Sequence, residues 1–142
     1  MTSAAEYEKK VWAIVETVAK NKKIELHFGT IQEAKYHKAR ITQMQKELKL
    51  VRKDIGVTKK AINSSYTSQK TQVGKGLGTS ITAGLFGKKA VGKANAVTRD
   101  TLRLAQQNAI RPYENVLRLI DNIIIQLDQL KLQIDSWVIK NS

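Results

Sequence analysis

Residues 113–137 read YENVLRLIDNIIIQLDQLKLQIDSW, and this stretch decides the fold. Its apolar residues recur at alternating steps of three and four, the spacing that places side chains along one seam of a long helix. We predict a C-terminal heptad helix over residues 99–140, with a start or kink near Pro112 because the residue before a proline is biased away from helical angles. The predicted seam, for oligomer or bundle contacts, consists of Val116, Ile120, Ile123, Leu127, Leu130, Ile134 and Trp137.

Two further stripes follow the same seven-residue repeat on this predicted helix. One is acidic, and the other is apolar and lies away from the seam. A helix that is apolar on two sides is typical of the inside of a bundle or of an oligomer interface. The acidic stripe is Glu114, Asp121, Asp128 and Asp135, and the apolar stripe is Ile125, Leu132 and Ile139.

The N-terminal segment predicts a first helix over residues 4–28. Its apolar residues Tyr7, Val11, Ile14 and Val18 fall on one side of such a helix. Residues 24–28 alternate between apolar and polar side chains as a strand does, but the sequence offers no convincing partner strand. We therefore favour a helix end or an extended connector there, with a strand as the alternative.

A second, long basic helix is predicted over residues 30–72. Gly29 is typical of the residue after a helix, and Thr30 followed by Glu33 is a capping box that begins a new one. Gly56 lies inside this helix and lowers its stability by about 1 kcal/mol relative to alanine, so a bend or break is expected to be tolerated there.

Residues 73–98 are rich in glycine and lysine and hold six of the eight glycines of the chain. This composition predicts a turn that reverses the chain, followed by either a further helix or a mobile basic loop. The predicted fold class is therefore all-α, with long antiparallel helices forming a helical bundle or coiled coil and a Gly-rich turn or loop in the middle. We expect a single domain over residues 1–142.

The sequence gives no support to catalysis or to a bound cofactor. It has no cysteine, and its two histidines lack the carboxylate spacing of a metal motif. The Gly-rich segment lacks the Gly-Lys-Ser/Thr ending of a phosphate-binding loop. We expect no enzyme activity, no metal, no cofactor and no small-molecule substrate. The N-terminus carries acidic residues and no apolar run approaches ~18 residues, so a soluble, cytoplasmic protein is expected.

The net charge of +13 is concentrated in the middle of the chain. Residues 35–111 hold 17 lysines and arginines against three acidic residues, an excess of 14, whereas residues 112–142 hold three against four. Six of these lysines fall within an arc of about 80° on the predicted long helix, at ~100° per residue. The candidate polyanion-binding residues are Lys35, Lys38, Lys46, Lys49, Lys53, Lys60, Lys75, Lys88, Lys89, Lys93, Arg99 and Arg103.

These features predict a non-enzymatic, self-associating basic protein that binds a polyanion. The first expectation is sequence-independent binding of DNA or RNA, or nucleoprotein assembly, because lysines meet phosphates without reading bases. A structural coiled-coil adaptor or filament or oligomer subunit with protein partners is an alternative. Peripheral binding to an anionic membrane through residues 85–91 is another. A further alternative is that the lysine-lined helix face only keeps the protein soluble and binds none of these partners.

Overall fold

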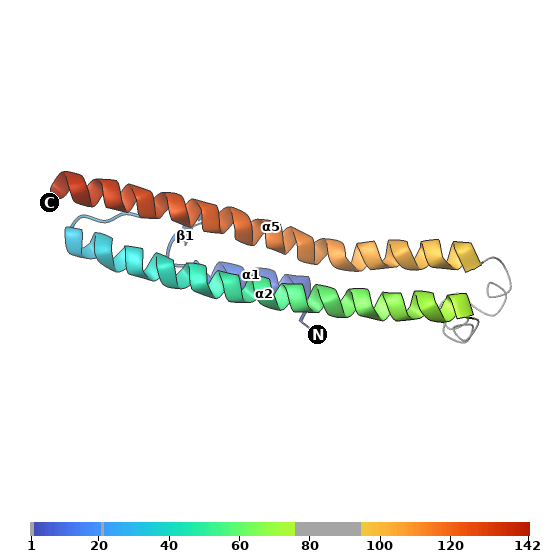
Figure 1. The fold of residues 1–142 in the computed structure, drawn as a ribbon. Coiled ribbons are helices and arrows are strands. Elements are labelled where there is room, and N and C mark those ends of the chain that lie inside the picture. Colours follow the sequence, from blue (N-terminus) through green and yellow to red (C-terminus); the bar gives the residue numbers. More distant parts are fainter. Residues whose placement is uncertain (1, 21, 76–94) are drawn as a thin grey trace. The chain divides into compact units, whose positions relative to one another are not determined.

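The computed structural model describes residues 2–20, 22–75 and 95–142 (Figure 1). The all-α class is confirmed for this part of the chain, in which the only strands are two residues long. Residues 76–94, which make up most of the predicted Gly-rich turn, lie outside the described residues. The described elements are α1 (Ala4–Ile14), β1 (Ala19–Lys20), β2 (Lys23–Ile24), α2 (Ile31–Lys75) and α5 (Asn95–Asn141).

A single domain is predicted over residues 1–142, and the contacts between residues group this chain into two compact units. The first unit combines Met1–Ile55 with Glu114–Ser142, and the second is Gly56–Tyr113. Each unit thus contains one segment of α2 and one segment of α5. The first unit also contains α1 and both strands, and it holds most of the buried residues.

Helix α1 is shorter than predicted. Ser3 caps its N-terminus by accepting a hydrogen bond from the Glu6 amide at 3.2 Å. The helix ends at Ile14 rather than near residue 28. The residues that follow, Val15, Thr17 and Val18, are β-branched and therefore weak helix formers.

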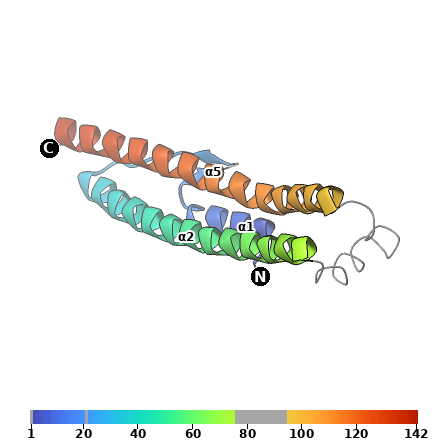
Figure 2. The ribbon, with the colours of Figure 1, turned by 45° about the vertical axis from the view of Figure 1, so that its right-hand side comes forward.

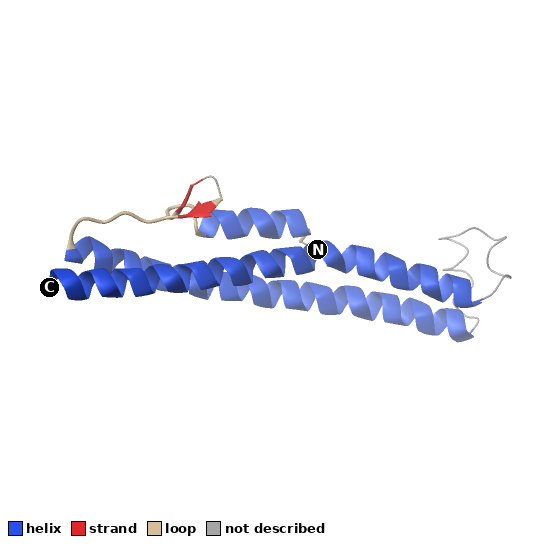
Figure 3. Cartoon of the chain, turned by 90° about the horizontal axis from the view of Figure 1, so that it is seen from above, coloured by secondary structure: helices blue, strands red, loops and turns tan. Residues whose placement is uncertain are grey.

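The chain after α1 forms a small hairpin, which Figure 3 shows in red beside α1. Ala19 pairs with Ile24 in antiparallel β1 and β2, and Lys20 pairs with Lys23. Lys22 adopts a left-handed backbone angle, with φ of 64°, in the turn. Ile24 is therefore in a strand, which was the less favoured alternative for this segment. The partner strand β1 was not predicted.

The capping box predicted at the start of α2 is confirmed. The Glu33 amide donates to Thr30 Oγ1 at 3.1 Å. The Glu33 carboxylate accepts from the Gly29 amide at 2.9 Å, which completes the reciprocal arrangement one residue earlier than in the standard motif. Helix α2 then runs from Ile31 to Lys75 without a break at Gly56.

Helix α5 begins at Asn95 and ends at Asn141, so the helix does not start near Pro112. A kink at Pro112, the other alternative, stays a prediction. Pro112 lies inside the helix and lacks the amide that would bond to the carbonyl of Asn108. One missing hydrogen bond does not end a helix that is packed along its length, because helical stability in proteins comes mainly from packing of the apolar face.

Three helical segments and the turn after α1 supply the core of the first unit. Figure 2 shows α1 alongside α2. The buried side chains of α2 and α5 follow the predicted heptad spacing, and α1 continues its apolar face through Val15. These buried residues are Tyr7, Val11, Val15, Val18, Ala34, Ile41, Met44, Leu48, Val51, Ile55, Val116, Ile120, Ile123, Leu127, Leu130 and Ile134.

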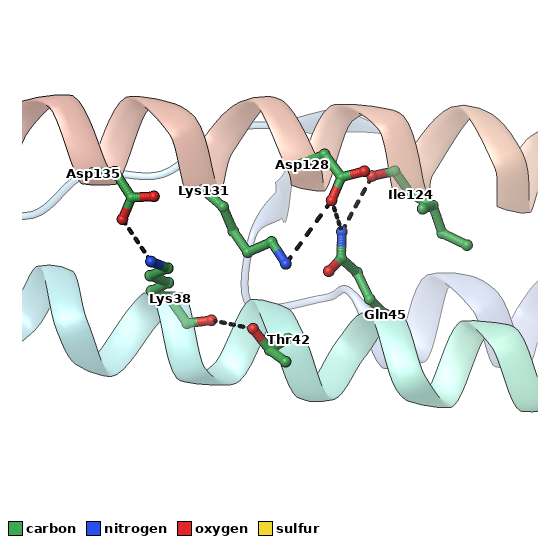
Figure 4. Close-up of polar contacts among 7 residues, drawn as sticks. All are labelled: Lys38, Thr42, Gln45, Ile124, Asp128, Lys131 and Asp135. Carbon is green, nitrogen blue, oxygen red and sulfur yellow. Dashed lines mark hydrogen bonds and ion pairs between the residues drawn. The ribbon is translucent and has the colours of Figure 1, made fainter.

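A polar ladder joins the α2 and α5 segments of the first unit beside this core (Figure 4). The residue numbers rise by seven from rung to rung on α2 and fall by seven on α5, so the contact recurs once in every heptad. The three rungs are Lys38–Asp135 at 2.6 Å, Gln45–Asp128 at 2.7 Å and Arg52–Asp121 at 2.8 Å.

In the middle rung the glutamine is buried, while the Asp128 side chain is 60% exposed. Gln45 is 6% exposed, and its Nε2 donates both to Asp128 Oδ1 and to the Ile124 carbonyl, the latter at 3.3 Å. Lys131 lies 3.9 Å from the same Asp128 oxygen. Two donors, one of them charged, therefore surround this carboxylate (Figure 4).

The second unit has its own small core. Ile62 and Leu102 are buried, as are Ile110 and Tyr113. Here, too, a side-chain hydrogen bond links α2 to α5, from Gln106 Nε2 to Asn63 Oδ1 at 2.6 Å. The combination of an apolar contact and an amide contact thus occurs in both units.

The burial pattern predicts very different costs for two leucines two residues apart on α2. Leu48 is 0% exposed and Leu50 is 64% exposed. We expect Leu48→Ala to lower the free energy of unfolding by about 2–5 kcal/mol because it leaves a cavity. The matched change Leu50→Ala should stay within about 0.5 kcal/mol. Urea unfolding followed by circular dichroism measures both, and equal costs would contradict the assigned core.

The polar ladder predicts unequal coupling between its rungs. A double-mutant cycle of Gln45→Ala and Asp128→Ala should give a coupling on the order of 1.5 kcal/mol, since a buried amide bonds to a charged group. The cycle of Arg52→Ala and Asp121→Ala should give about 0.2–1 kcal/mol, because water screens that exposed pair. Stability measured in urea tests this, and the reverse order would show that the ladder is assigned wrongly.

Candidate polyanion-binding face of α2

Three exposed lysines of α2 form the candidate site in the first unit, and we call Lys46, Lys49 and Lys53 the lysine face. Their steps of three and four keep them on one side of the helix. At ~100° per residue this side points away from the buried Leu48, so the packing of the core determines which way the lysines face.

The lysine face has no acidic partner among the described residues. No described carboxylate lies within 4.0 Å of the ammonium groups of Lys46, Lys49 or Lys53. Like charges at such spacing repel one another on a helix surface, which costs a few tenths of a kcal/mol per pair. A polyanion that approached this face would relieve the repulsion.

Lys38 differs from the lysines with which the sequence groups it. Its Nζ lies 2.6 Å from Asp135 Oδ1, and the two side chains are 45% and 46% exposed. The charge of Lys38 is thus already matched within the chain. Lys35 and Lys60 are exposed, Lys35 in the first unit and Lys60 in the second.

The remaining predicted basic residues lie elsewhere or outside the described part. Arg99 and Arg103 are exposed in the second unit, where Arg103 Nη2 lies 3.8 Å from Asp100 Oδ1. Lys75 is the last residue of α2, and its side chain is not described. Three more of these residues, Lys88, Lys89 and Lys93, lie outside the described residues. Their binding of a polyanion stays a prediction.

The predicted seam of α5 is covered by the chain itself. Six of its seven residues are buried in the first unit, from Val116 to Ile134. Trp137 is partly exposed and meets the Phe28 ring edge to face, with ring centres 4.9 Å apart. Within the described residues, the seam therefore serves the packing of one chain.

The polar ladder was not predicted, although the sequence carries its signal. Lys38, Gln45 and Arg52 share one heptad position on α2. The acidic stripe of α5 has the same period of seven residues. The structure pairs three of its acids with α2 of the same chain.

A hollow of about 320 Å³ lies between the connector after β2 and α5. Three glutamine amides, one carboxylate and the imidazole of His27 face it, a mixture without a strong charge of either sign. No group of three or more His, Asp or Glu side chains in the described residues is placed to hold a metal ion. The lining residues are Ile24, Glu25, Leu26, His27, Gln126, Gln129, Leu130 and Gln133.

None of α1, α2 and α5, over the residues described, contains a stretch apolar and long enough to cross a bilayer. Comparison with known proteins gives no relative: no family model, no curated protein and no solved structure matches the chain.

Proposed function

We propose that this protein binds the phosphate backbone of nucleic acid through the lysine face, without reading the base sequence and without catalysis. The observation that supports this most directly is the set of three exposed, unmatched lysines on one side of α2. Lysine is a compact point charge that contacts phosphate without the planar geometry needed to recognise a base.

The spacing of the lysine face suits a phosphate chain. Lys46 and Lys53 lie seven residues apart, which is about 10 Å along a helix at ~1.5 Å per residue. Duplex DNA carries about one phosphate per 1.7 Å of its axis, so about six phosphates occupy the same length. Each lysine therefore has a phosphate within reach of its flexible side chain.

The face contains no aromatic residue on which a base would stack. The stretch from Lys46 to Lys53 has Leu50 as its exposed large apolar residue, and it contains no Phe, Tyr or Trp. Proteins that bind single strands commonly stack bases on aromatic side chains. The absence of such residues in this stretch supports binding governed by charge alone, to DNA or RNA.

We further propose that α2 and α5 form an antiparallel coiled coil connected through the Gly-rich turn predicted for residues 73–98. The opposite numbering of the ladder rungs supports this arrangement. It would hold the lysine face on a stiff helix, so that binding requires little loss of backbone entropy. Localisation in the cytoplasm remains a prediction.

The lysine face predicts a measurable salt dependence. We expect the wild-type chain to bind unrelated 30-base-pair duplexes with a logarithm of the association constant that falls linearly with the logarithm of salt concentration. The variant K46Q/K49Q/K53Q should reduce the magnitude of this slope by about 2.7, since each phosphate contact contributes ~0.9. Fluorescence anisotropy at several salt concentrations measures both slopes.

A matched control removes the same charge elsewhere. Lys9, Lys22 and Lys23 are exposed and lie outside α2, so K9Q/K22Q/K23Q should keep nearly the wild-type slope. If this control weakens binding as much as the first variant, net charge rather than the lysine face governs affinity. No binding by the wild-type chain at about 50 mM salt would refute the proposed function.

A further inference from the structure

A second stripe of α5 is apolar and uncovered. Ile125, Leu132 and Ile139 are 55%, 67% and 76% exposed, and we call these three residues the outer stripe. They are separated by seven residues each, so they share one side of the helix. This side is opposite the buried seam, where Leu127 and Ile134 have almost no exposed surface.

We propose that the outer stripe binds a second copy of this chain, with the two α5 helices antiparallel about a two-fold axis at Leu132. This contact would be independent of the lysine face, which lies on α2. It uses the second apolar stripe of α5, which is exposed, and it leaves the predicted seam buried inside each chain.

The residues that flank the outer stripe favour a protein partner over a polyanion or a lipid surface. An anionic membrane or a nucleic acid needs basic residues beside the contact. Here one flank is acidic and the other is neutral and polar, and residues 112–142 carry three basic residues against four acidic ones. The flanking residues are Asp121, Asp128 and Asp135 on one side and Asn122, Gln129 and Ser136 on the other.

The spacing of the stripe is self-complementary. Ile125 and Ile139 are equally distant from Leu132 along the chain, so an antiparallel copy brings Ile125 opposite Ile139 of the second copy. The same operation brings Gln129 beside Ser136 of the second copy, which pairs an amide with a hydroxyl. A two-fold contact of this kind closes on itself and stops at two chains.

The acidic flank would not prevent this pairing. Antiparallel packing places like flanks together, so Asp128 of one chain would approach Asp135 of the second copy. Both carboxylates already have partners in their own chain: Asp135 lies 2.6 Å from Lys38, and Asp128 is bonded to Gln45 and lies 3.9 Å from Lys131. These contacts reduce the repulsion between the two acids.

A hollow beside the stripe provides a seat for a side chain of the second copy. It has a volume of about 390 Å³ and lies along the last turns of α5. In the antiparallel arrangement, Ile125 of the second copy falls near this end of the helix. The hollow is lined by Leu132, Gln133, Ser136, Trp137 and Lys140.

The exposed apolar residues of α2 form a poorer surface. Leu50 is exposed, but Gln43 stands one heptad before it and interrupts the stripe. Tyr36, one heptad further, already has the Arg40 guanidinium 5.9 Å from its ring centre and in hydrogen-bonding contact with its hydroxyl. The outer stripe of α5, by contrast, is apolar at three successive heptads.

The proposed contact is small, and its response to salt is opposite to that of nucleic-acid binding. Three apolar anchors per chain are few beside the roughly 20–30 residues per side of a standard interface, so the dimer should form at high protein concentration. Each copy carries +13, which opposes association. Salt screens this repulsion, so dimerisation should strengthen as nucleic-acid binding weakens.

Single cysteines test the register, because the chain contains none of its own. Under a mild oxidant, L132C should form a disulfide-linked dimer with itself. I125C alone and I139C alone should not, since each lies about 21 Å from its own copy at ~1.5 Å per residue, but a mixture of the two should cross-link. L50C, equally exposed on α2, is the matched control.

Mass in solution tests the contact without a cross-link. Sedimentation of the wild-type chain in 1 M salt should show dimers, and L132Q should weaken association by about tenfold or more while L50Q leaves it unchanged. Circular dichroism checks that both variants fold. Cross-linking of L132C no faster than L50C would overturn the proposal, as would self-cross-linking of I125C and I139C, which indicates parallel helices. Neither result would alter nucleic-acid binding by the lysine face.

Discussion

The hydrogen bonds of Gln45 fix how α5 is aligned along α2 in the first unit. This amide is buried beside a seam of aliphatic side chains, where a polar group without partners costs about 1–3 kcal/mol. Both of its acceptors, the Ile124 carbonyl and Asp128, belong to α5. A shift of α5 by a single residue would break both bonds and rotate the seam by about 100° away from α2. The apolar core and the buried amide therefore require the same alignment, and the position of the lysine face depends on it.

A shift by a whole heptad is a different case, because the acids of α5 recur every seven residues. Lys38 would then meet Asp128 in place of Asp135, so the ion pair alone does not distinguish the two alignments. The contact between Phe28 and Trp137 distinguishes the two alignments. Phe28 directly precedes the capped start of α2, so its position relative to that helix is fixed. A heptad shift would move the rings apart by about 10 Å along the helix.

Local signals predicted the features that depend on neighbouring residues. The capping box at Thr30, the long basic helix and the buried seam of α5 follow from spacing within single segments. The hairpin after α1 was not predicted, because β1 and β2 pair across a turn in which Lys22 takes a left-handed angle. The ion pair of Lys38 with Asp135 also could not be predicted from the spacing of lysines on α2. A lysine on one helix is free or matched depending on which residue of α5 lies beside it, and a helical wheel drawn for α2 alone does not contain that information.

The two residues of each ladder rung are far apart in the sequence, and the loop between them can vary in length. Lys38 and Asp135 are 97 residues apart, and Arg52 and Asp121 are 69 apart. The entropy lost in closing such a loop grows only with the logarithm of its length, so even a doubling costs about 0.6 kcal/mol. Residues added between Lys75 and Asn95 would thus change the free energy of closure very little. The alignment of α2 with α5 constrains the sequence of these helices closely, and it places almost no thermodynamic limit on the number of residues that connect them.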